Sequence, residues 1–566
     1  MDNVIVRNAS VNNLKNVSIS IPLSKYVVFT GKSGSGKSTL AVNVIMAGYL
    51  NKSQDVVVPK KPALFAQRIE MPSKSKSLEA FLGIKKCDSA GTLRDFIADV
   101  KTVIDKDVLL QIVELLSIDE LLMNRNVSHM SMTEYNKCRF VKMLIHTDAK
   151  LLIVDELSAT MTYEDTENIA LVYKLLVKNG YSLFIIDHSL SIIRHSDYVI
   201  EMGPEAGSGG GNVIFQGEFK KFQKSSSWKK MIEAYNKGNG CQKGLSKKLK
   251  IHDITYRNMK ELSLELPLHG IVSICGGMGA GKSSILDIIF KACDKSPMAW
   301  KNREGVMGEI EGKSNLRRPY IIDQSPIGKN AMSTPATYTK IMDSLRKIYV
   351  DLCDPSTFTV SDFSYNAKGK CAICGGKGYK EIALDDEVIY ERCPSCQGKR
   401  FNNHTLEIKD GNLDIGDTLN ITCRELYSLF KVDNKKKIIT EKIQFLNDVG
   451  LSYLALGQPS GTLSGGESQR IKIAKELSKK LGDRCLFILD SPAKGLHVLD
   501  LPKIISVLRK LVEKNNSIII SENSPYFLRN SDWLIYLDNG KLIYQGKPDG
   551  LPKRYKEKLG MEEKYE

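Results

Sequence analysis

The chain has 566 residues, of which 42% are hydrophobic and 26% charged, so its composition suits a globular protein of roughly three to five domains. No stretch approaches about twenty uninterrupted apolar residues, and the first residues lack a basic segment followed by an apolar one; we therefore expect no transmembrane helix, no signal peptide and a cytoplasmic protein. A formal net charge of +16 favours a polyanionic partner such as nucleic acid, because each Lys or Arg placed on a phosphate releases a counterion, although solvated basic faces would give the same total.

The first recognisable unit is a strand, a glycine-rich loop and a helix. Residues 26–30 form an apolar run typical of a buried strand, residues 31–38 read GKSGSGKS, and residues 39–46 have a helical pattern. The loop fits the phosphate-binding pattern GxxxxGK[ST] in the context that this motif requires. Its glycines let backbone amides approach phosphates, its lysine neutralises the β- and γ-phosphates, and its hydroxyl group can hold Mg²⁺. The residues expected to bind ATP and Mg²⁺ here are Gly31, Gly34, Gly36, Lys37, Ser38 and Thr39.

Further along the first half, residues 151–156 (LLIVDE) read as a Walker B strand that ends in Asp155 and Glu156. His188 follows the next apolar run, where a switch histidine is expected, and Gln67 is a candidate Q-loop glutamine. We expect Lys37 and His188 to contact the γ-phosphate, and Glu156 to orient and deprotonate the attacking water.

The second half repeats this arrangement. Residues 276–283 (GGMGAGKS) again follow an apolar run (271–275) and precede a helical pattern (284–290), and an Asn-x-Lys segment lies at the same distance before each glycine loop. Two such loops in matching contexts argue against a chance match. Residues 485–491 (CLFILDS) keep the Walker B aspartate but end in Ser491, and Asn523 stands at the switch position. The residues expected to bind a second ATP are Gly276, Gly279, Gly281, Lys282, Ser283, Ser284, Gln324 and Asp490.

A signature motif follows in the second half, where residues 462–470 read TLSGGESQR, the ABC signature almost letter for letter. Residues 129–137 (HMSMTEYNK) align with it without gaps and keep its serine and glutamate, but Met132 and Thr133 replace both glycines. The signature residues expected at the nucleotide are Ser464, Gly465, Gly466 and Glu467.

The second half also carries an extra segment between its P-loop and its signature. Within it, Cys371, Cys374, Cys393 and Cys396 form two CxxC pairs, the spacing of a tetrahedral four-thiolate Zn²⁺ site. The other eight cysteines have no regular spacing, which favours a reducing compartment over a disulfide framework. No histidine lies among the four, so we expect a closed, structural site. The basic residues of this segment, which either contact DNA or are merely solvated, are Lys368, Lys370, Lys377, Lys399 and Arg400.

Together these patterns predict an α/β protein made of two tandem ABC-type P-loop ATPase cassettes with helical signature subdomains and a zinc-binding insertion. The first cassette is expected over residues 1–217, a basic, Ser-containing linker over 218–250, and the second cassette over 251–566. The zinc module and signature subdomain are expected at about residues 353–475.

This combination resembles UvrA, the damage sensor of bacterial nucleotide excision repair. A CxxC–CxxC module between the P-loop and the signature is typical of the second half of UvrA and not of standalone ABC cassettes. Segments 323–328 (DQSPIG), 363–368 (FSYNAK), 396–400 (CQGKR) and 203–211 (GPEAGSGGG) are also similar to the family. The resemblance covers nearly the whole chain. It implies damaged or drug-bound double-stranded DNA as the partner, a possible homodimer, no membrane, and ATP, Mg²⁺ and Zn²⁺ as cofactors.

Two departures from the family matter. Too few residues separate Lys37 from Ser131 to hold the two domains that UvrA carries there, which argues against handover to UvrB and UvrC. In ABC proteins, ATP lies between the P-loop of one cassette and the signature of the other. The replacements at Met132, Thr133, Ser491 and Asn523 therefore all fall on the site of the second P-loop. We expect one hydrolytic site and one degenerate site that binds ATP but hydrolyses it slowly.

The resulting hypothesis is an ATPase that forms ADP and phosphate, senses damaged or drug-modified DNA and is not itself a nuclease. One alternative is an antibiotic self-resistance or regulatory protein that acts without the nuclease subunits. Another is a ribosome-associated ATPase of the ABC-F type, which would lack the zinc insertion and keep two intact signatures. The ATPase part of a membrane transporter would have no role for the zinc module.

Overall fold

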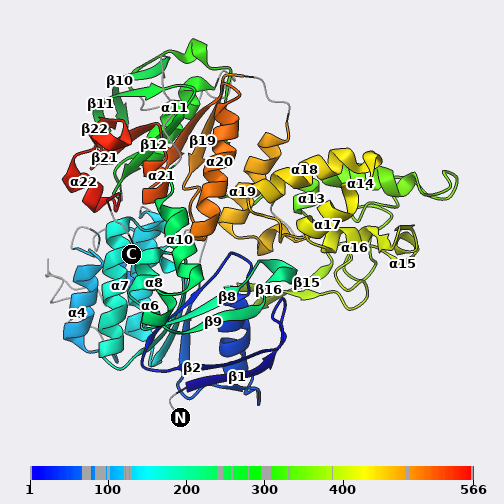
Figure 1. Cartoon of the computed structure of the whole chain (residues 1–566), viewed down its shortest axis with the longest axis horizontal. Coiled ribbons are helices and arrows are strands. Elements are labelled where there is room, and N and C mark those ends of the chain that lie inside the picture. The colour runs from blue at the N-terminus through cyan, green and yellow to red at the C-terminus, as the bar shows by residue number, and fades with distance from the viewer. Residues whose placement is uncertain are drawn as a thin grey trace. The chain divides into compact units, whose positions relative to one another are not determined.

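The computed structural model describes residues 3–66, 78–82, 97, 102–119, 122, 126–127, 130–238, 247–256, 259–277, 279–294, 307–328, 332–384, 387–479, 483–562 and 565. The chain divides into two compact units, one made of residues 1–321 and 484–566 and the other of residues 322–483. Both large sheets belong to the first unit, whereas the second is mainly helical (Figure 1). Among the described residues, no helix combines the length and the apolar character needed to cross a membrane.

The first large sheet comes from the first half of the sequence. Its six strands, in spatial order, are β5 (Pro62–Phe65), β6 (Leu151–Asp155), β7 (Ser182–Ile186), β3 (Tyr26–Thr30), β8 (Tyr198–Gly203) and β9 (Asn212–Glu218). Neighbouring strands run parallel, except that β9 is antiparallel to β8. A small antiparallel sheet of the same cassette contains β2 (Val17–Pro22), β1 (Asn3–Ala9) and β4 (Val56–Val57).

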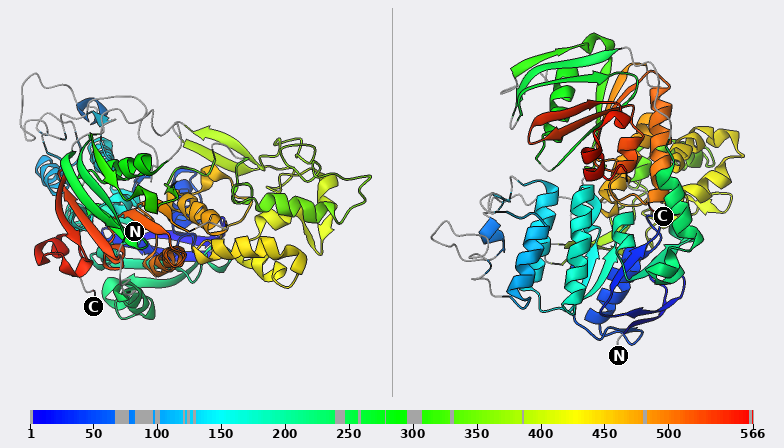
Figure 2. Two further views of the ribbon diagram at one scale, coloured as in Figure 1. Left: turned by 90° about the horizontal axis from the view of Figure 1, so that it is seen from above. Right: turned by 60° about the vertical axis from the view of Figure 1, so that its left-hand side comes forward.

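Helices cover both faces of this sheet (Figure 2), as the complete burial of β3 and β7 requires. Because alternate residues of a strand point to opposite faces, Phe29 packs in one core with Leu40 of η1, whereas Tyr26 meets the ring of Tyr173 of α7 edge-on at 5.3 Å. The helices of this cassette are η1 (Thr39–Met46), α1 (Ala47–Leu50), α2 (Leu78–Leu82), α4 (Lys106–Leu115), α6 (Met132–His146), η3 (Leu157–Thr160), α7 (Tyr163–Lys178), α8 (Leu190–Arg194) and η4 (Gly207–Gly209).

The second large sheet repeats the same strand order, with the strand before the P-loop in the fourth place. Its strands are β14 (Arg318–Ile322), β19 (Cys485–Asp490), β20 (Ser517–Ser521), β12 (Ile271–Gly276), β21 (Trp533–Asp538) and β22 (Lys541–Gly546). A small sheet again accompanies it, formed by β11 (Met259–Pro267), β10 (Lys248–Tyr256) and β13 (Met307–Glu311). The helices are α11 (Lys282–Cys293), η5 (Lys313–Asn315), η8 (Val498–Asp500), α20 (Leu501–Val512), α21 (Pro525–Arg529), η9 (Pro548–Gly550) and α22 (Lys553–Lys558). The predicted fold class is confirmed.

The second unit carries the cysteine pairs and the second signature. Its antiparallel hairpin of β15 (Tyr379–Leu384) and β16 (Glu387–Arg392) joins the two CxxC pairs, and β17 (Lys409–Asp410) pairs with β18 (Leu413–Asp414). Its helices are α13 (Pro335–Tyr338), α14 (Ile341–Val350), α15 (Asn403–Leu406), α16 (Ile415–Asn420), α17 (Cys423–Phe430), η6 (Asn434–Lys436), α18 (Lys437–Asp448), η7 (Ser460–Thr462) and α19 (Gly465–Leu477).

The predicted elements around the P-loops lie where the sequence puts them. The strand expected at 26–30 is β3, and the one expected at 271–275 continues by one residue to Gly276. The stretch predicted as a linker contains α9 (Phe219–Phe222) and α10 (Ser226–Asn236). Trp228, Met231 and Tyr235 recur at helical spacing and are buried on one face of α10, so apolar periodicity makes this part of the connection a packed helix.

Candidate nucleotide-binding sites and metal centre

The backbone of the first glycine loop binds the side chain of the loop's own lysine. Gly31, Gly34 and Gly36 all have positive φ, and a Cβ on Gly31 would lie 2.1 Å from the carbonyl oxygen of Met202, so this position accepts only glycine. Lys37 is 5% exposed, and its Nζ donates to the carbonyl oxygens of Gly31 and Lys32, each at 2.9 Å. The ammonium group is thus held by two carbonyl oxygens of the loop whose backbone N–H groups the motif offers to phosphates.

The Walker B strand β6 ends beside this loop. The hydroxyl of Ser38 stabilises the ionised carboxyl of Asp155, so the two expected Mg²⁺ ligands lie near each other. Burial raises the pKa of Asp155 to about 7, and the charge of Glu156 adds to this, whereas Lys37 and Ser38 oppose it. A carboxylate and a hydroxyl oxygen beside a second carboxylate fit a divalent cation. Such a cation would favour the ionised form of Asp155. Asp155 and Ser38 would hold Mg²⁺, and Mg²⁺ would neutralise charge on the phosphates.

The next residues bring the predicted base and switch residue together. Glu156 adopts a left-handed conformation with φ +49°, and its N–H donates to the carbonyl of Ile186 at 2.9 Å. Its Oε1 lies 3.4 Å from Nε2 of His188. Asp187 accepts hydrogen bonds from Ser158 Oγ at 2.6 Å and from the backbone N–H of His188 at 2.7 Å, so this carboxylate fixes the switch loop. Sequence reasoning missed Asp187.

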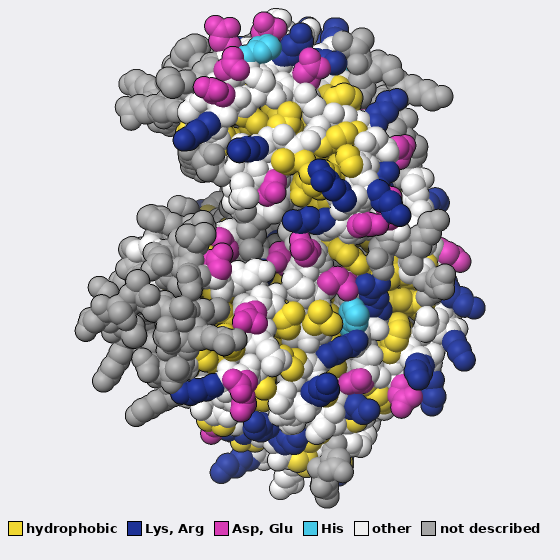
Figure 3. Space-filling model, turned by 90° about the vertical axis from the view of Figure 1, so that its left-hand side faces the viewer, with side chains coloured by type: hydrophobic (Ala, Val, Ile, Leu, Met, Phe, Trp, Pro, Cys, Tyr) yellow, Lys and Arg dark blue, Asp and Glu magenta, His cyan; other side chains and the backbone are white. Residues whose placement is uncertain are grey.

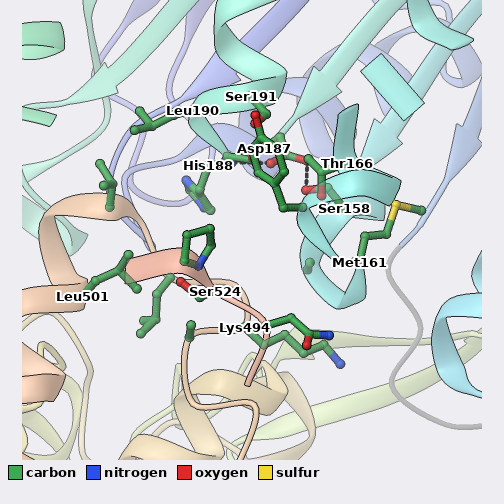
Figure 4. Close-up of a pocket in the computed structure, with 18 of the residues that line it drawn as sticks. Ser158, Met161, Thr166, Asp187, His188, Leu190, Ser191, Lys494, Leu501 and Ser524 are labelled. Atoms are coloured by element: carbon green, nitrogen blue, oxygen red, sulfur yellow. Dashed lines mark hydrogen bonds between the residues drawn. The ribbon is translucent and has the colours of Figure 1, made fainter. Parts of the chain in front are cut away.

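A loop of the second cassette completes this region, residues 491–497, which we call the cross-loop. Ser33 Oγ of the first P-loop donates to the carbonyl oxygen of Gly495 at 3.2 Å, and a Cβ on Gly495 would lie 3.2 Å from Oε2 of Glu156. A cavity of about 160 Å³ lies here and is lined by both cassettes, with Ser158, Asp187 and His188 on one side and Lys494 and Ser524 on the other (Figure 4). Motif reasoning did not find Ser33, Lys494 or Gly495, because their role depends on a contact between distant segments.

The second P-loop binds its own lysine in the same way. Gly276, Gly279 and Gly281 have positive φ, and Lys282 Nζ donates to the carbonyl oxygens of Gly276 at 2.7 Å and Gly277 at 2.8 Å. Burial lowers the pKa of Lys282, although Cys275 and Asp490 oppose the shift. Ser283 and Ser284 lie in the first turn of α11, directly after Lys282.

The groups around the second P-loop differ from those of the first. Ser491 has the same φ of +49° as Glu156, and its N–H likewise donates to the neighbouring strand, at 2.7 Å to Ser521 O, but its hydroxyl donates to Asp490 Oδ1 at 3.2 Å. Asn523 Oδ1 accepts from the N–H of Gly276 at 3.2 Å. Glu522 takes the place of Asp187 and accepts from the backbone N–H of Asn523 at 2.8 Å. The backbone framework is kept, while the base and the imidazole are replaced.

Both signatures begin a helix. Ser131 and Ser464 are the N-caps of α6 and α19, and each forms a capping box with the glutamate three residues later, Glu134 or Glu467. The residues that the two signatures share therefore build the helix start, and the difference lies in the glycines: Gly465 and Gly466 follow one cap, whereas Met132 and Thr133 follow the other.

The two Q-loop candidates have different outcomes. Gln324 lies in the second unit next to the signature, because a Cβ on Gly465 would lie 3.4 Å from Cβ of Gln324. Gln67 lies outside the described residues. The pairing of the second signature with the first P-loop stays a prediction.

The four cysteines of the extra segment converge. The sulfur atoms of Cys371, Cys374, Cys393 and Cys396 all lie within 4.8 Å of one another, and the Sγ atoms of Cys374 and Cys396 are 3.7 Å apart. Burial opposes ionisation of Cys371, but the N–H groups of Cys374 and Ile373 outweigh it and lower its pKa to about 7. The N–H of Gly378 donates to Cys374 Sγ at 3.2 Å. Convergent thiols with amide donors fit Zn²⁺, which would cross-link the two CxxC turns.

Comparisons with known proteins found a matching family model and similar sequences. The family model described as ABC transporter matches residues 14–159. The chain is 34% identical over 451 residues to the UvrABC system protein A of Aquifex aeolicus, which covers 76% of this chain and 48% of that protein. It is 33% identical over 497 residues to the UvrABC system protein A of Thermus thermophilus. That alignment covers 84% of this chain and 51% of the relative. The chain thus spans about half the length of these curated relatives.

Solved structures show the same fold. The crystal structure of UvrA2 from Deinococcus radiodurans has a TM-score of 0.80 at 21% identity and covers 97% of both chains. A model of ribosome-bound archaeal Pelota and ABCE1 has a TM-score of 0.55 at 15% identity and covers 99% of this chain and 81% of that one, so its likeness is one of fold alone. The paired P-loop sheets, the four-cysteine cluster and the sequence relatives agree, and the chain belongs to the UvrA-like ABC ATPases.

Proposed function

We propose that this chain is an ATP-driven DNA-binding protein of the UvrA type, in which one nucleotide site hydrolyses ATP and the other only holds it. The observation that carries this proposal is the contrast at the two Walker B ends. Glu156 lies 3.4 Å from His188 beside the first P-loop, whereas the hydroxyl of Ser491 is bonded to Asp490 beside the second. A carboxylate next to an imidazole suits general-base chemistry, and a serine hydroxyl does not.

At the first site each side chain has a separate task. The amides of the glycine loop and Lys37 bind the phosphates, and Ser38 with Asp155 holds Mg²⁺. Glu156 accepts the proton of the attacking water, and His188 contacts the γ-phosphate and responds to its loss. The second signature, at Ser464, Gly465, Gly466 and Glu467, closes the site from its other side, because glycines let the amides at the start of α19 approach phosphate oxygens.

At the second site the side chains that would carry out hydrolysis are replaced. Lys282 and its glycine loop still bind phosphates, and Asp490 with Ser283 still suits Mg²⁺. Neither Ser491 nor the amide of Asn523 takes a proton from water at neutral pH. Met132 and Thr133 place side chains at the start of α6, where glycine amides would reach the nucleotide. The second site therefore acts as an ATP-holding clamp while the first turns over.

The proposed partner is double-stranded DNA, recognised when damaged or drug-modified, as the resemblance to UvrA implies. The net charge of +16 favours phosphate contact. On the face drawn in Figure 3, Lys and Arg alternate with Asp and Glu instead of forming one basic patch, so that face is not assigned to DNA. Recognition by backbone contact and deformability fits a protein in which no residue is identified as a reader of base edges.

The test of DNA binding is fluorescence anisotropy of a labelled duplex, undamaged or carrying a bulky or intercalated adduct. The protein is titrated with ATP, ADP or no nucleotide at about 0.15 M salt, where the Debye length is about 8 Å and loose attraction is screened. Tighter binding of the adduct duplex that changes with nucleotide is the expected result. Absence of binding in every state would refute the DNA proposal and direct the search to ribosomes.

The cysteine cluster is tested by metal analysis. Elemental analysis should find about one Zn²⁺ per chain. The double variant Cys371→Ser, Cys393→Ser should contain no zinc, because a four-thiolate site needs ligands from both cysteine pairs. Cys353→Ser is the matched control, because Cys353 donates to the carbonyl of Tyr349 and lies outside the cluster. Zinc retained by the double variant would contradict the assignment.

A variant of the proposal concerns the step after DNA binding. Too few residues separate the first P-loop from the first signature to hold the partner-binding and insertion domains of UvrA. We therefore favour action without the nuclease subunits, as in displacement of a drug from DNA. Pull-down with UvrB and UvrC should recover no complex, and recovery of a stable complex would return the protein to excision repair.

A further inference from the structure

A glycine-rich loop of the first cassette packs against the first P-loop. It comprises residues 204–211, which we call the buttress loop, and it connects β8 with β9. A Cβ on Gly210 would lie 3.2 Å from Cα of Ser35 in the P-loop. Gly211 has φ +86°, and a Cβ there would lie 1.8 Å from the carbonyl oxygen of Asn13. The buttress loop therefore needs glycine at these positions, because it approaches other backbone segments so closely.

This contact supplies hydrogen bonds to carbonyl groups in the middle of the P-loop. Gly207 N–H donates to the carbonyl oxygen of Gly34 at 2.9 Å, and Gly211 N–H donates to that of Ser35 at 3.0 Å. The side chain of Asn13 also donates to the carbonyl oxygen of Gly34, through Nδ2 at 3.0 Å. Three donors outside the motif thus hold two successive carbonyl groups of the motif.

Holding these carbonyl groups also directs the amides that follow them. In a trans peptide the C=O group and the next N–H group point in opposite directions, and both peptide bonds concerned are trans. The N–H of Ser35 accordingly donates on the other side, to Lys32 O at 3.1 Å, an oxygen that also accepts from Nζ of Lys37. By the same rule the N–H of Gly36 points away from Gly211. Amides directed in this way form the anion-binding concavity of a P-loop.

The simpler role of the buttress loop is to attach the small sheet to the large one. Lys15 N–H, between β1 and β2, donates to Gly211 O at 3.0 Å and makes such a link. The second cassette joins its small sheet differently, since Glu265 N–H donates to Oε1 of Gln545 in β22 at 2.9 Å. Only two residues, 539–540, connect its β21 and β22. Attachment of a small sheet therefore does not require a long connection at this place.

The two P-loops are supported alike at their first glycine. A Cβ on Gly31 would lie 2.1 Å from Met202 O, and a Cβ on Gly276 would lie 2.2 Å from Leu537 O. The neighbouring strand therefore fixes the start of the P-loop in both cassettes. The eight-residue connection that also holds the middle of the P-loop belongs to the first cassette, which is the cassette with Glu156.

We propose that the buttress loop and Asn13 are positioning elements of the first nucleotide site, which direct the P-loop amides toward the phosphates before ATP binds. Because the amides are already oriented, phosphate binding needs less ordering of the backbone, and the γ-phosphate is held in one place for the attack of water. This inference rests on the proposed function, because it assigns the support to the site that hydrolyses ATP. It adds a difference in backbone support to the differences in side chains between the two sites.

Asn13→Asp tests the side-chain part of this support. The substitution keeps the size of the side chain and replaces its N–H donor by a carboxylate oxygen, which cannot donate to Gly34 O. We expect kcat/KM for ATP to fall at least about tenfold, because the phosphates then meet amides that are less well oriented. Asn12→Asp is the matched control: it makes the same change at the neighbouring exposed residue and should stay within about twofold of the wild type.

A second variant removes the backbone part of the support by replacing residues 204–211 with Asn-Gly, the connection found in the second cassette. Gly203 pairs with Asn212 as Asp538 pairs with Lys541, so a two-residue hairpin turn fits between β8 and β9. This variant should lose at least as much kcat/KM as the point variant, because two carbonyl groups lose a donor. The unfolding midpoint shows whether it is folded, and if it is not, the point variant decides alone.

Affinity for ADP gives a readout that a merely structural role would not move. In a Lys282→Ala background, which weakens the second site, Asn13→Asp should lower the affinity for ADP at least about fivefold at an unchanged unfolding midpoint, because ADP still presents phosphates to the amides. Wild-type kcat/KM and ADP affinity in Asn13→Asp would overturn the proposal. An equal loss in Asn12→Asp would also overturn it, since added charge alone would then explain the effect.

Glu156→Gln in the same assay keeps the two proposals apart. If Glu156→Gln loses turnover and Asn13→Asp changes neither turnover nor ADP affinity, the role of the buttress loop is wrong and the proposed function stands. If the wild type hydrolyses ATP no faster than Glu156→Gln, the first site is not hydrolytic and the proposed function is overturned. The ADP affinity of Asn13→Asp then still decides whether the buttress loop orients the amides.

Discussion

At the end of β6 the residue after the Walker B aspartate is Glu156, and at the end of β19 it is Ser491, yet both backbones adopt φ +49°. Each N–H donates to the neighbouring strand, and each following switch loop is held by a buried acidic residue, Asp187 in one cassette and Glu522 in the other. The backbone at the two Walker B ends is thus the same, whereas the side chains proposed to act on water and on the γ-phosphate differ. Under the proposed function, a site changed in this way keeps its shape for binding ATP and loses hydrolysis.

The largest expected effect is that of removing the base. Glu156→Gln should lower steady-state ATP turnover by at least about 100-fold, because the amide cannot accept the proton of the attacking water. Ser491→Ala, the matched change in the other cassette, should leave turnover within about twofold, as measured by phosphate release. Equal losses in the two variants would break the distinction between the sites.

The two P-loop lysines give the next effect. Lys37→Ala should also lower turnover strongly. Lys282→Ala should weaken nucleotide binding at the second site and lower turnover by less than about tenfold, because in the proposed function that site does not hydrolyse ATP. The measurement combines phosphate release with the stoichiometry of ATP retained per chain. Loss of turnover in Lys282→Ala as complete as in Glu156→Gln would contradict a clamp at the second site.

Glu167 and its charged neighbours should make the stability of the first cassette depend on acidic pH. Oε2 of Glu167 in α7 lies 3.0 Å from Nε2 of His195 and 2.9 Å from the guanidinium of Arg194. Burial raises the pKa of this carboxyl, but hydrogen bonds from His195, Ser191 and Arg194 outweigh burial and lower the pKa to about 2. Because the folded pKa lies below the ordinary value of 4.5, this stabilisation is complete above about pH 4.5 and is lost as the pH falls toward about 2. Pro502 stands at the equivalent position of the second cassette.

Glu167 is partly exposed, so its contribution is discounted for solvent screening to roughly 1 kcal/mol. Urea unfolding of the wild type should therefore lose about 1 kcal/mol more than Glu167→Gln over this range of pH. Identical pH profiles for the two proteins would show that the cluster makes no net contribution.

The smallest effect is expected from rebuilding the second site. Ser491→Glu with Asn523→His should leave turnover nearly unchanged, because Met132 and Thr133 still stand at the start of α6. Adding Met132→Gly and Thr133→Gly should at most about double the rate, since a second competent site would then join the first. A doubling with the first pair alone would show that the altered signature is harmless.

Much of this molecule could be predicted from its sequence, because the relevant signals are local. The strands at 26–30 and 151–155, the glycine loops and the two CxxC pairs are short patterns whose spacing reflects backbone geometry, and the structure places β3, β6 and the sulfur atoms accordingly. The residues that the two aligned signatures share form capping boxes, which act within one helix turn and are therefore also local.

The parts that sequence reasoning missed depend on segments far apart in the chain. The composition of residues 218–250 predicts a linker, and only the structure shows that this stretch contains α10 with Trp228, Met231 and Tyr235 buried. The sequence by itself determined the repeat, the replacement of Glu156 and His188 by Ser491 and Asn523 in the other cassette, and the two cysteine pairs. Only the tertiary structure decided that Gly495 and His497 of the second cassette lie against Ser33, Glu156 and His188 of the first, because such contacts result from how the two sheets pack within their unit and leave no periodic signal in either loop.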